Sequence, residues 1–182
     1  MRYVSFTRPD GAASFGRLDG DTVFDLSGAY ASLKAAIAAD ALAGLADGQA
    51  FALSAITLLP VIPDPDKILC VGLNYATHVA ETGREQKEHP AIFTRYADSL
   101  IAHGEAMVRP RESERFDYEG ELAIIIGKGG RRIKEEDAWD HIAGYSCYND
   151  GSVRDWQVAT SQWTPGKNFY NTGGVGPWMV AR

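Results

Sequence analysis

The start of the chain alternates apolar and polar positions and is punctuated by Asp-Gly pairs. Tyr3-Val4-Ser5-Phe6 and Ser14-Phe15-Gly16-Arg17-Leu18 predict short strands, with turns at Asp10-Gly11 and Asp19-Gly20. Turns of this composition join neighbouring antiparallel strands. The Ala- and Leu-rich residues 32–45 then predict one helix or a pair of short helices. The pattern indicates a small, β-rich opening unit.

A dense run of prolines and aspartates follows over residues 60–66. Prolines at this density interrupt regular structure and are typical of a linker. We therefore place a boundary near Pro63, with a small N-terminal domain over residues 1–63 and a second domain over residues 64–182.

The second domain alternates apolar runs with helical patterns. Residues 67–71 predict a buried strand ending at Gly72, and residues 74–81 predict a helix with Asn74 as its N-cap. Residues 121–126 predict a second buried strand, residues 134–143 a helix, and residues 145–148 a short strand before Asn149-Asp150-Gly151. The fold class expected from this mixture is α+β, rich in strands.

Composition and charge narrow the class of protein. The chain has 182 residues, of which 45% are hydrophobic, and a net charge of −6 without a basic patch, so we expect no nucleic-acid partner. The start of the chain lacks an apolar signal segment and the apolar residues 50–62 are too short to span a bilayer, so we expect no membrane partner. Cys70 and Cys147 predict buried free thiols in a reducing compartment, hence a cytoplasmic location.

Two acidic residues flank a glycine at the start of the strand over residues 121–126. In an extended chain Glu119 and Glu121 point to the same face, because strand side chains alternate. Two neighbouring carboxylates repel each other unless a cation neutralises them, and a hard divalent ion prefers such oxygen ligands. The alternative, an exposed strand start with two solvated acids, stays open.

Further candidates follow from position and spacing. Asp150 ends a predicted strand beside Gly151, where it is either presented at a sheet edge or part of a plain turn. His78 and Glu81 are three residues apart on a predicted helix, so they share a face. A carboxylate beside a histidine suits a base that activates water, although such pairs are also common as surface neighbours.

The last candidates come from the C-terminal third of the chain. Arg154 and Gln157 are also three residues apart, and Lys167 lies in a glycine-loosened loop that could present its ammonium group to an anion. For each of them a plain surface position is the alternative. Residues 82–90 are charged and lack a pattern, which predicts either a lid over a bound substrate or a solvated loop.

The order of these pieces resembles the fumarylacetoacetate hydrolase family. Residues 72–81 are similar to its Gly-x-Asn-Tyr-x-x-His-x-x-Glu segment, and residues 116–128 are similar to its metal-binding strand. Residues 149–157 resemble its Asn-Asp-x-Ser-x-Arg-Asp-x-Gln segment, and residues 166–178 its Gly-Lys-x-Phe…Gly-Pro stretch. The resemblance covers about residues 60 to 180.

The resemblance implies a role for each candidate residue. It makes Glu119, Glu121 and Asp150 the ligands of Mg2+ or Mn2+, with Ca2+ as a substitute. It makes His78 and Glu81 the dyad that activates water, and Lys167 the group that holds a substrate carboxylate or a developing oxyanion. Arg154 and Gln157 are then substrate-binding residues.

The resemblance also implies a fold and an activity. The expected fold is a β-rich mixed-sheet roll with a small N-terminal domain, in a homodimer when the protein is full length. The expected activity is hydrolysis of a C–C bond in a small 2,4-dioxo acid, of the acylpyruvate or fumarylacetoacetate type, in the catabolism of aromatic compounds. The alternatives are an isomerase, decarboxylase or hydratase that acts on a related oxo acid through a metal-bound enolate, or a non-catalytic homologue.

The sequence departs from the family pattern in two places. Many members carry a Cys-Pro-Leu-Gly-Pro-like segment where this chain has residues 171–177, which alters a wall of the expected pocket. The chain also stops at Arg182, where family members continue, so we expect the catalytic domain to be incomplete at its C-terminus.

Overall fold

A computed structural model describes residues 1–82 and 89–182, and for His78, Glu81 and Thr82 it describes the backbone alone. In this part of the chain, none of the helices has the length and apolar character needed to cross a membrane. The predicted lid over residues 82–90 falls mostly outside the described residues and stays a prediction.

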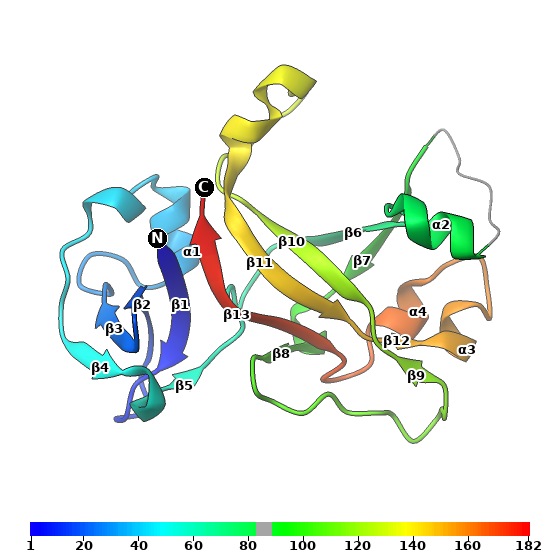
Figure 1. Ribbon diagram of the computed structural model, residues 1–182, viewed down its shortest axis with the longest axis horizontal. Coiled ribbons are helices and arrows are strands. Elements are labelled where there is room, and N and C mark those ends of the chain that lie inside the picture. The colour runs from blue at the N-terminus through cyan, green and yellow to red at the C-terminus, as the bar shows by residue number, and fades with distance from the viewer. Residues whose placement is uncertain (83–88) are drawn as a thin grey trace.

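The structure is built from short strands connected by turns and short helices (Figure 1). The strands are β1 (Arg2–Thr7), β2 (Ala13–Asp19), β3 (Thr22–Asp25), β4 (Ala50–Ala52), β5 (Thr57–Leu58), β6 (Ile68–Gly72), β7 (Ala91–Arg95), β8 (Leu100–Ala102), β9 (Phe116–Asp117), β10 (Gly120–Ile126), β11 (Ile142–Asp150), β12 (Ser152–Val153) and β13 (Gly173–Ala181). The α-helices are α1 (Leu33–Ala38), α2 (Ala76–Thr82), α3 (Arg154–Gln157) and α4 (Thr164–Lys167). Single 3-10 turns cover Leu42–Gly44, Leu53–Ala55 and Ala97–Ser99, and a longer 3-10 segment covers Glu135–His141.

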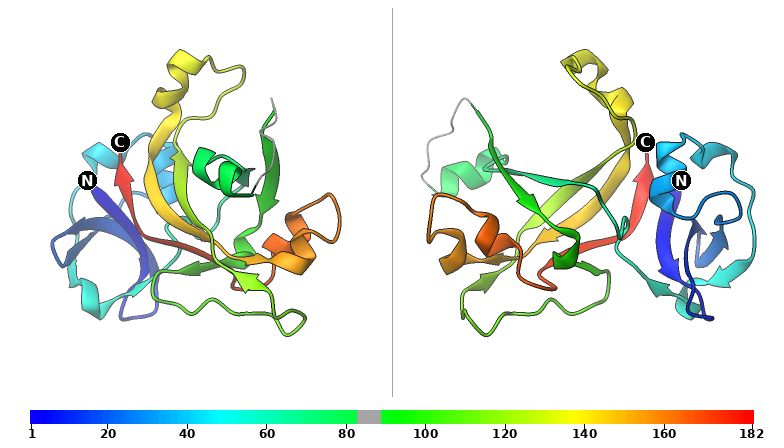
Figure 2. Two further views of the ribbon diagram at one scale, coloured as in Figure 1. Left: turned by 45° about the vertical axis from the view of Figure 1, so that its right-hand side comes forward. Right: turned by 180° about the vertical axis from the view of Figure 1, so that it is seen from behind.

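One large sheet runs through the molecule in the order β10-β11-β13-β1-β2-β3-β4. All of these neighbours pair antiparallel, whereas β8 joins β13 in parallel and β5 joins β1 antiparallel. The first and last strands are partners, so the two ends of the chain lie side by side in every view (Figures 1 and 2). The expected β-rich, mixed-sheet fold is confirmed.

The sheet is continuous across the boundary that we placed near Pro63, because β1 from the first unit pairs with β13 from the second. The segment around Pro63 links β5 to β6, and the boundary itself stays a prediction. Two smaller pairs, β6 with β7 and β9 with β12, stand beside the large sheet and carry residues toward the end of β11.

The main hydrophobic core lies where the N-terminal strands meet β13. Helix α1 begins after the N-cap Ser32, whose side chain accepts a hydrogen bond from the backbone of Ala35, and it buries Leu33 and Ile37 against the sheet. Met179 of β13 is fully buried in the same cluster. Because β11 is hydrogen-bonded to β13 in the sheet, this core also anchors β11, the strand that ends in Asp150.

Two helix predictions differ from the structure in detail. The helix predicted over residues 134–143 is a 3-10 helix over Glu135–His141, and Ile142 begins β11 opposite Ile126. The apolar side of this segment does not pack against the hydrophobic core, since Trp139 remains 60% exposed. Helix α2 starts at Ala76, so Asn74 is not its N-cap, and Leu73 before it has a positive φ of 57°.

Two further predictions were wrong about burial. The strands predicted as buried each expose one face, with Leu69 and Val71 outward on β6 and Leu122, Ile124 and Ile126 outward on β10. Cys147 faces the same exposed side of the sheet as its cross-strand partner Leu122, and Cys70 is only partly buried. The free state of both thiols agrees with the prediction.

Candidate active site

The predicted acidic residues meet where β10 begins and β11 ends. The backbone amide of Asp150 donates to the carbonyl oxygen of Glu119 at 2.9 Å, so the antiparallel pairing itself sets these two residues opposite each other. Glu121 lies opposite Tyr148, one step further along the same face. Gly151 follows in a tight place, because a Cβ there would lie 2.1 Å from the carbonyl oxygen of Thr172. Sheet register therefore builds the acidic side of the site.

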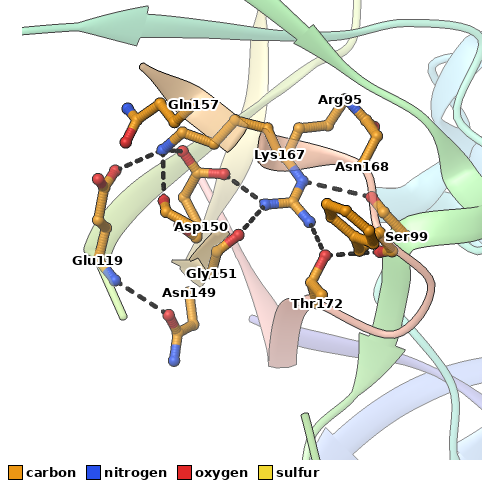
Figure 3. Close-up of polar contacts among 12 residues, drawn as sticks. Arg95, Ser99, Glu119, Asn149, Asp150, Gly151, Gln157, Lys167, Asn168 and Thr172 are labelled. Carbon is orange, nitrogen blue, oxygen red and sulfur yellow. Dashed lines mark hydrogen bonds and ion pairs between the residues drawn. The ribbon is translucent and has the colours of Figure 1, made fainter. Parts of the chain in front are cut away.

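Lys167 is at the centre of the site and is not a surface residue. It ends α4, its side chain is 1% exposed, and its Nζ lies 2.9 Å from Oε2 of Glu119 and 2.7 Å from Oδ2 of Asp150 (Figure 3). The ammonium group also donates to Oγ of Ser152 at 2.7 Å. Three oxygen acceptors thus surround one buried positive charge. The sequence analysis expected Lys167 in a loop and did not predict that its side chain is buried.

Arg154 and Gln157 lie beside this cluster and contact each other. Arg154 forms an ion pair with the second carboxylate oxygen of Glu119 and another with Asp117 at 2.8 Å. It also donates to Oε1 of Gln157 at 3.0 Å. Glu119 is therefore held between two cationic side chains, one on α3 and one on α4.

The two glutamates are in different electrostatic states. Burial opposes ionisation of Glu119, but the charges of Lys167 and Arg154 outweigh it and lower the pKa of its carboxyl group. Burial raises the pKa of Glu121, a hydrogen bond from Tyr75 counteracts this, and the negative charges of Glu119 and Asp150 raise it further. Glu121 is thus the carboxyl group of the site with the least compensated charge.

Arg95 is a site residue that the sequence analysis missed. It ends β7 with its side chain fully buried, and its Nη1 lies 2.6 Å from Oδ1 of Asp150 (Figure 3). The same guanidinium group donates to the carbonyl oxygen of Gly151 and, through Nη2, to Oγ1 of Thr172 at 2.9 Å. Arg95 lies two residues after the buried Phe93, so both side chains point to the same inward face of β7. A cation at such an inward position was the signal that could have identified it.

Tyr75 and Asp117 were also missed. Oη of Tyr75 accepts a hydrogen bond from the backbone amide of Leu122 at 3.2 Å, which ties the segment before α2 to the start of β10. His78 and Glu81 follow on α2, but their side chains lie outside the described residues, so their role as a catalytic dyad stays a prediction.

The donor set suits a hard cation. Glu119 and Asp150 already share one positive charge, that of Lys167, and Glu121 faces the same space from β10. Among the described residues, no three acidic, histidine or cysteine side chains stand in a ready ligand arrangement, since Lys167 lies between the carboxylates. The three predicted ligands fit a divalent ion chemically if Lys167 and Glu121 shift.

Cys70 points from β6 into the same region. Burial, together with the charge of Asp150, raises the pKa of its thiol to about 12. The group is therefore protonated at neutral pH and contributes a neutral wall to the site rather than a nucleophile.

Two known family models match the chain. Residues 67–182 match the model "Fumarylacetoacetate (FAA) hydrolase C-terminal", and residues 1–60 match "Rv2993c-like, N-terminal". An oxaloacetate tautomerase of Xenopus laevis is 42% identical over 131 residues, which are 71% of this chain and 41% of that protein. The oxaloacetate tautomerase YisK of Bacillus subtilis is 42% identical over 134 residues, which are 71% of this chain and 44% of that protein.

Solved structures extend the likeness to the whole chain. A 5-carboxymethyl-2-hydroxymuconate delta-isomerase of Mycobacterium smegmatis superposes with a TM-score of 0.82 at 27% identity, covering 100% of this chain and 67% of that one. A fumarylacetoacetate hydrolase of Exiguobacterium antarcticum gives a TM-score of 0.81 at 30% identity, covering 100% of this chain and 66% of that one. The chain spans less than half the length of the two tautomerases named above. With the family model matched over residues 67–182 and the same fold in these enzymes, the chain belongs to the fumarylacetoacetate hydrolase family.

Proposed function

We propose that this protein is a divalent-metal-dependent enzyme that acts on a small 2-oxo acid through its enolate, with keto–enol tautomerisation as the reaction. The observation that carries the proposal is the buried ammonium group of Lys167 between Glu119 and Asp150. A buried cation beside paired carboxylates is suited to a substrate that becomes more negative as it reacts. The names of relatives from Xenopus laevis and Bacillus subtilis, both oxaloacetate tautomerases, support this reaction.

Each residue has a task in this reaction. Tautomerisation moves one proton from the carbon beside the ketone to its oxygen, and the electron pair of the broken C–H bond becomes the enolate. A Mg2+ or Mn2+ ion held by Glu119, Glu121 and Asp150 would supply Lewis-acid chemistry to the substrate oxygens. Lys167 supplies positive charge beside the oxygen where negative charge forms, Arg154 and Gln157 orient the acid, and His78 with Glu81 is the proposed proton carrier.

Hydrolysis of a C–C bond in a 2,4-dioxo acid is the second candidate. It uses the same enolate but also requires an activated water molecule, for which the His78–Glu81 spacing is the supporting observation. The similarity to a fumarylacetoacetate hydrolase of Exiguobacterium antarcticum favours it as well. Both reactions need the same acidic residues, so the fold alone does not separate them.

The first experiment measures thermal unfolding with and without Mg2+ plus oxalate, which mimics the enolate of a 2-oxo acid. At about a hundred times its dissociation constant a ligand adds roughly 2.7 kcal/mol to the free energy of unfolding. For a domain of this size that raises the unfolding temperature by about 5–10 °C. We expect this rise in the wild type and its loss in Glu119→Gln, whereas Glu114→Gln, an exposed acid of the preceding loop, should behave as the wild type.

The second experiment separates the two reactions. Decay of the enol absorbance of oxaloacetate reports tautomerisation, and pyruvate release from an acylpyruvate reports hydrolysis. We expect the first activity in the wild type and its loss in Glu119→Gln. A folded wild type that shows neither the ligand-induced rise nor either activity would contradict the proposal.

A further inference from the structure

Among the side chains that the structure describes, one buried polar atom has no hydrogen-bond partner, and it is Oη of Tyr148. Buried polar groups are nearly always paired, so an unpaired one indicates a missing partner such as a ligand. The site already described makes no use of this hydroxyl group.

Tyr148 lies on the face of the sheet that carries the acids of the candidate active site. It precedes Asp150 by two residues on β11 and pairs with Glu121 on β10, so its side chain points to the same face of the sheet as both acids. The guanidinium carbon of Arg95 lies 5.7 Å from the centroid of its ring. The phenol thus packs against a buried cation, where an anionic acceptor oxygen would be favoured.

Gly173 makes room for the hydroxyl group. A Cβ at this position would lie 2.6 Å from Oη of Tyr148 and 2.8 Å from Nη2 of Arg95, closer than real Cβ contacts. Gly173 belongs to residues 171–177, the segment in which this chain departs from the family pattern. The segment that differs from the family pattern therefore packs against Tyr148.

The hydroxyl group of a tyrosine carries one proton that it can donate in a hydrogen bond. None of the described side chains accepts a hydrogen bond from Oη of Tyr148.

We propose that Tyr148 is a specificity-determining residue that donates a hydrogen bond to an additional oxygen of a dicarboxylic 2-oxo acid. This inference rests on the proposed function. A chelating 2-oxo acid uses two oxygens at the metal, and a dicarboxylic one has a further carboxylate to accept the hydrogen bond. An acid without that group leaves the Tyr148 hydroxyl unpaired, as it is in the free protein, and gains no binding free energy from it.

The test compares the wild type with Tyr148→Phe, which removes only the hydroxyl group. For tautomerisation of oxaloacetate we expect KM to rise about tenfold with little change in kcat, the size expected for one hydrogen bond to a charged group. The inhibition constant of oxalate, which has only the chelating oxygens, should stay within about twofold of the wild type. Tyr145→Phe is the matched control, because Tyr145 pairs with Ile124 on the opposite, outward face.

A measurement without turnover accompanies the kinetics. Since the hydroxyl is unpaired in the free protein, Tyr148→Phe should unfold in the absence of ligand at the wild-type temperature or above it. A lower unfolding temperature, an unchanged KM, or equal weakening of oxaloacetate and oxalate would each overturn the role of Tyr148. Absence of turnover in the wild type would instead refute the proposed function, so the two failures are distinguishable.

Discussion

At the residue scale, Lys167 holds the carboxylates of the site together. Its ammonium group contacts Glu119 and Asp150, and the three side chains are 1%, 22% and 3% exposed for Lys167, Glu119 and Asp150. Because water has little access to these groups, removing one charge leaves the remaining charges buried without a partner. The lysine therefore contributes to stability as well as to the proposed chemistry.

We expect Lys167→Met to lower the free energy of unfolding by about 3 kcal/mol at neutral pH, because the buried carboxylates lose a shared cation. Urea unfolding measures this change. Mg2+ should stabilise the variant more than the wild type, since the ion replaces the missing ammonium group.

The matched control is Lys134→Met. Lys134 pairs with Glu136 at 3.0 Å, but both side chains are more than 70% exposed. Such a pair contributes at most about 1 kcal/mol. If Lys167→Met changed stability no more than this control, the buried ion cluster would not exist in solution.

The sequence singled out most of the charged residues of this site but not all of them. Glu119, Glu121 and Asp150 became candidates from their positions beside predicted strands, and the family resemblance gave them a role. Arg95 did not, because a single cation after Ile92-Phe93-Thr94 reads as the polar end of a strand. Its contact with Asp150 bridges 55 positions of sequence, and only the folded chain reveals it.

At the element scale, a single carboxylate joins the first three strands. Asp25, at the end of β3, accepts hydrogen bonds from Arg8 after β1 at 2.7 Å and from Ser14 of β2 at 2.8 Å. Ser27 donates to its other oxygen through both backbone and hydroxyl. Burial would raise the pKa of Asp25, but these hydrogen bonds lower it from 3.8 to about 2.

This arrangement predicts a pH dependence. A carboxyl group whose pKa is lower in the folded state stabilises the fold above its unfolded pKa, and that stability is lost as pH falls through the folded value. We expect Asp25 to contribute roughly 2 kcal/mol at neutral pH. The difference in unfolding free energy between the wild type and Asp25→Asn should shrink as pH falls from 3.8 to about 2.

Asp21→Asn, an exposed position in the turn before β3, is the control and should leave stability nearly unchanged over the same range. If the difference in unfolding free energy between the wild type and Asp25→Asn did not vary with pH, the charge of Asp25 would not be what stabilises the contact between the strands.

Element predictions succeeded where local pattern and tertiary contacts agree. The first two strands follow from alternation and Asp-Gly turns, and β1 and β2 form as expected. The segment Glu135–His141 had helical spacing, but Ile142 is drawn into β11 by pairing with Ile126. Sheet pairing therefore ends the helical segment before Ile142.

At the scale of the whole molecule, the large sheet has an outward apolar row on its end strand β10. Leu122, Ile124 and Ile126 are 60%, 51% and 62% exposed, and the sheet order places β10 at the end of the sheet. The sequence predicted this strand as buried because its outward and inward positions are both apolar. Apolar rows of this kind mark interaction surfaces.

We propose that a second copy of the chain covers this row, in line with the homodimer expected from the family resemblance. A row of apolar side chains on an end strand gains free energy by burial, at about 25 cal/mol for each Å2 removed from water. Ile124→Lys places a charge in the middle of the row and should therefore shift the association equilibrium toward monomer. Sedimentation equilibrium over a range of protein concentrations measures this shift.

The control is Ala52→Lys, which adds the same charge at an exposed position of β4, the strand at the opposite end of the sheet. It should leave association unchanged, since β4 carries no comparable apolar row. A wild type that stays monomeric, or an equal effect of both substitutions, would refute the proposed interface. Because Ile124 faces away from Glu121 on the same strand, an Ile124→Lys variant that is monomeric but still gains stability from Mg2+ plus oxalate would show that association and ligand binding use opposite faces of one sheet.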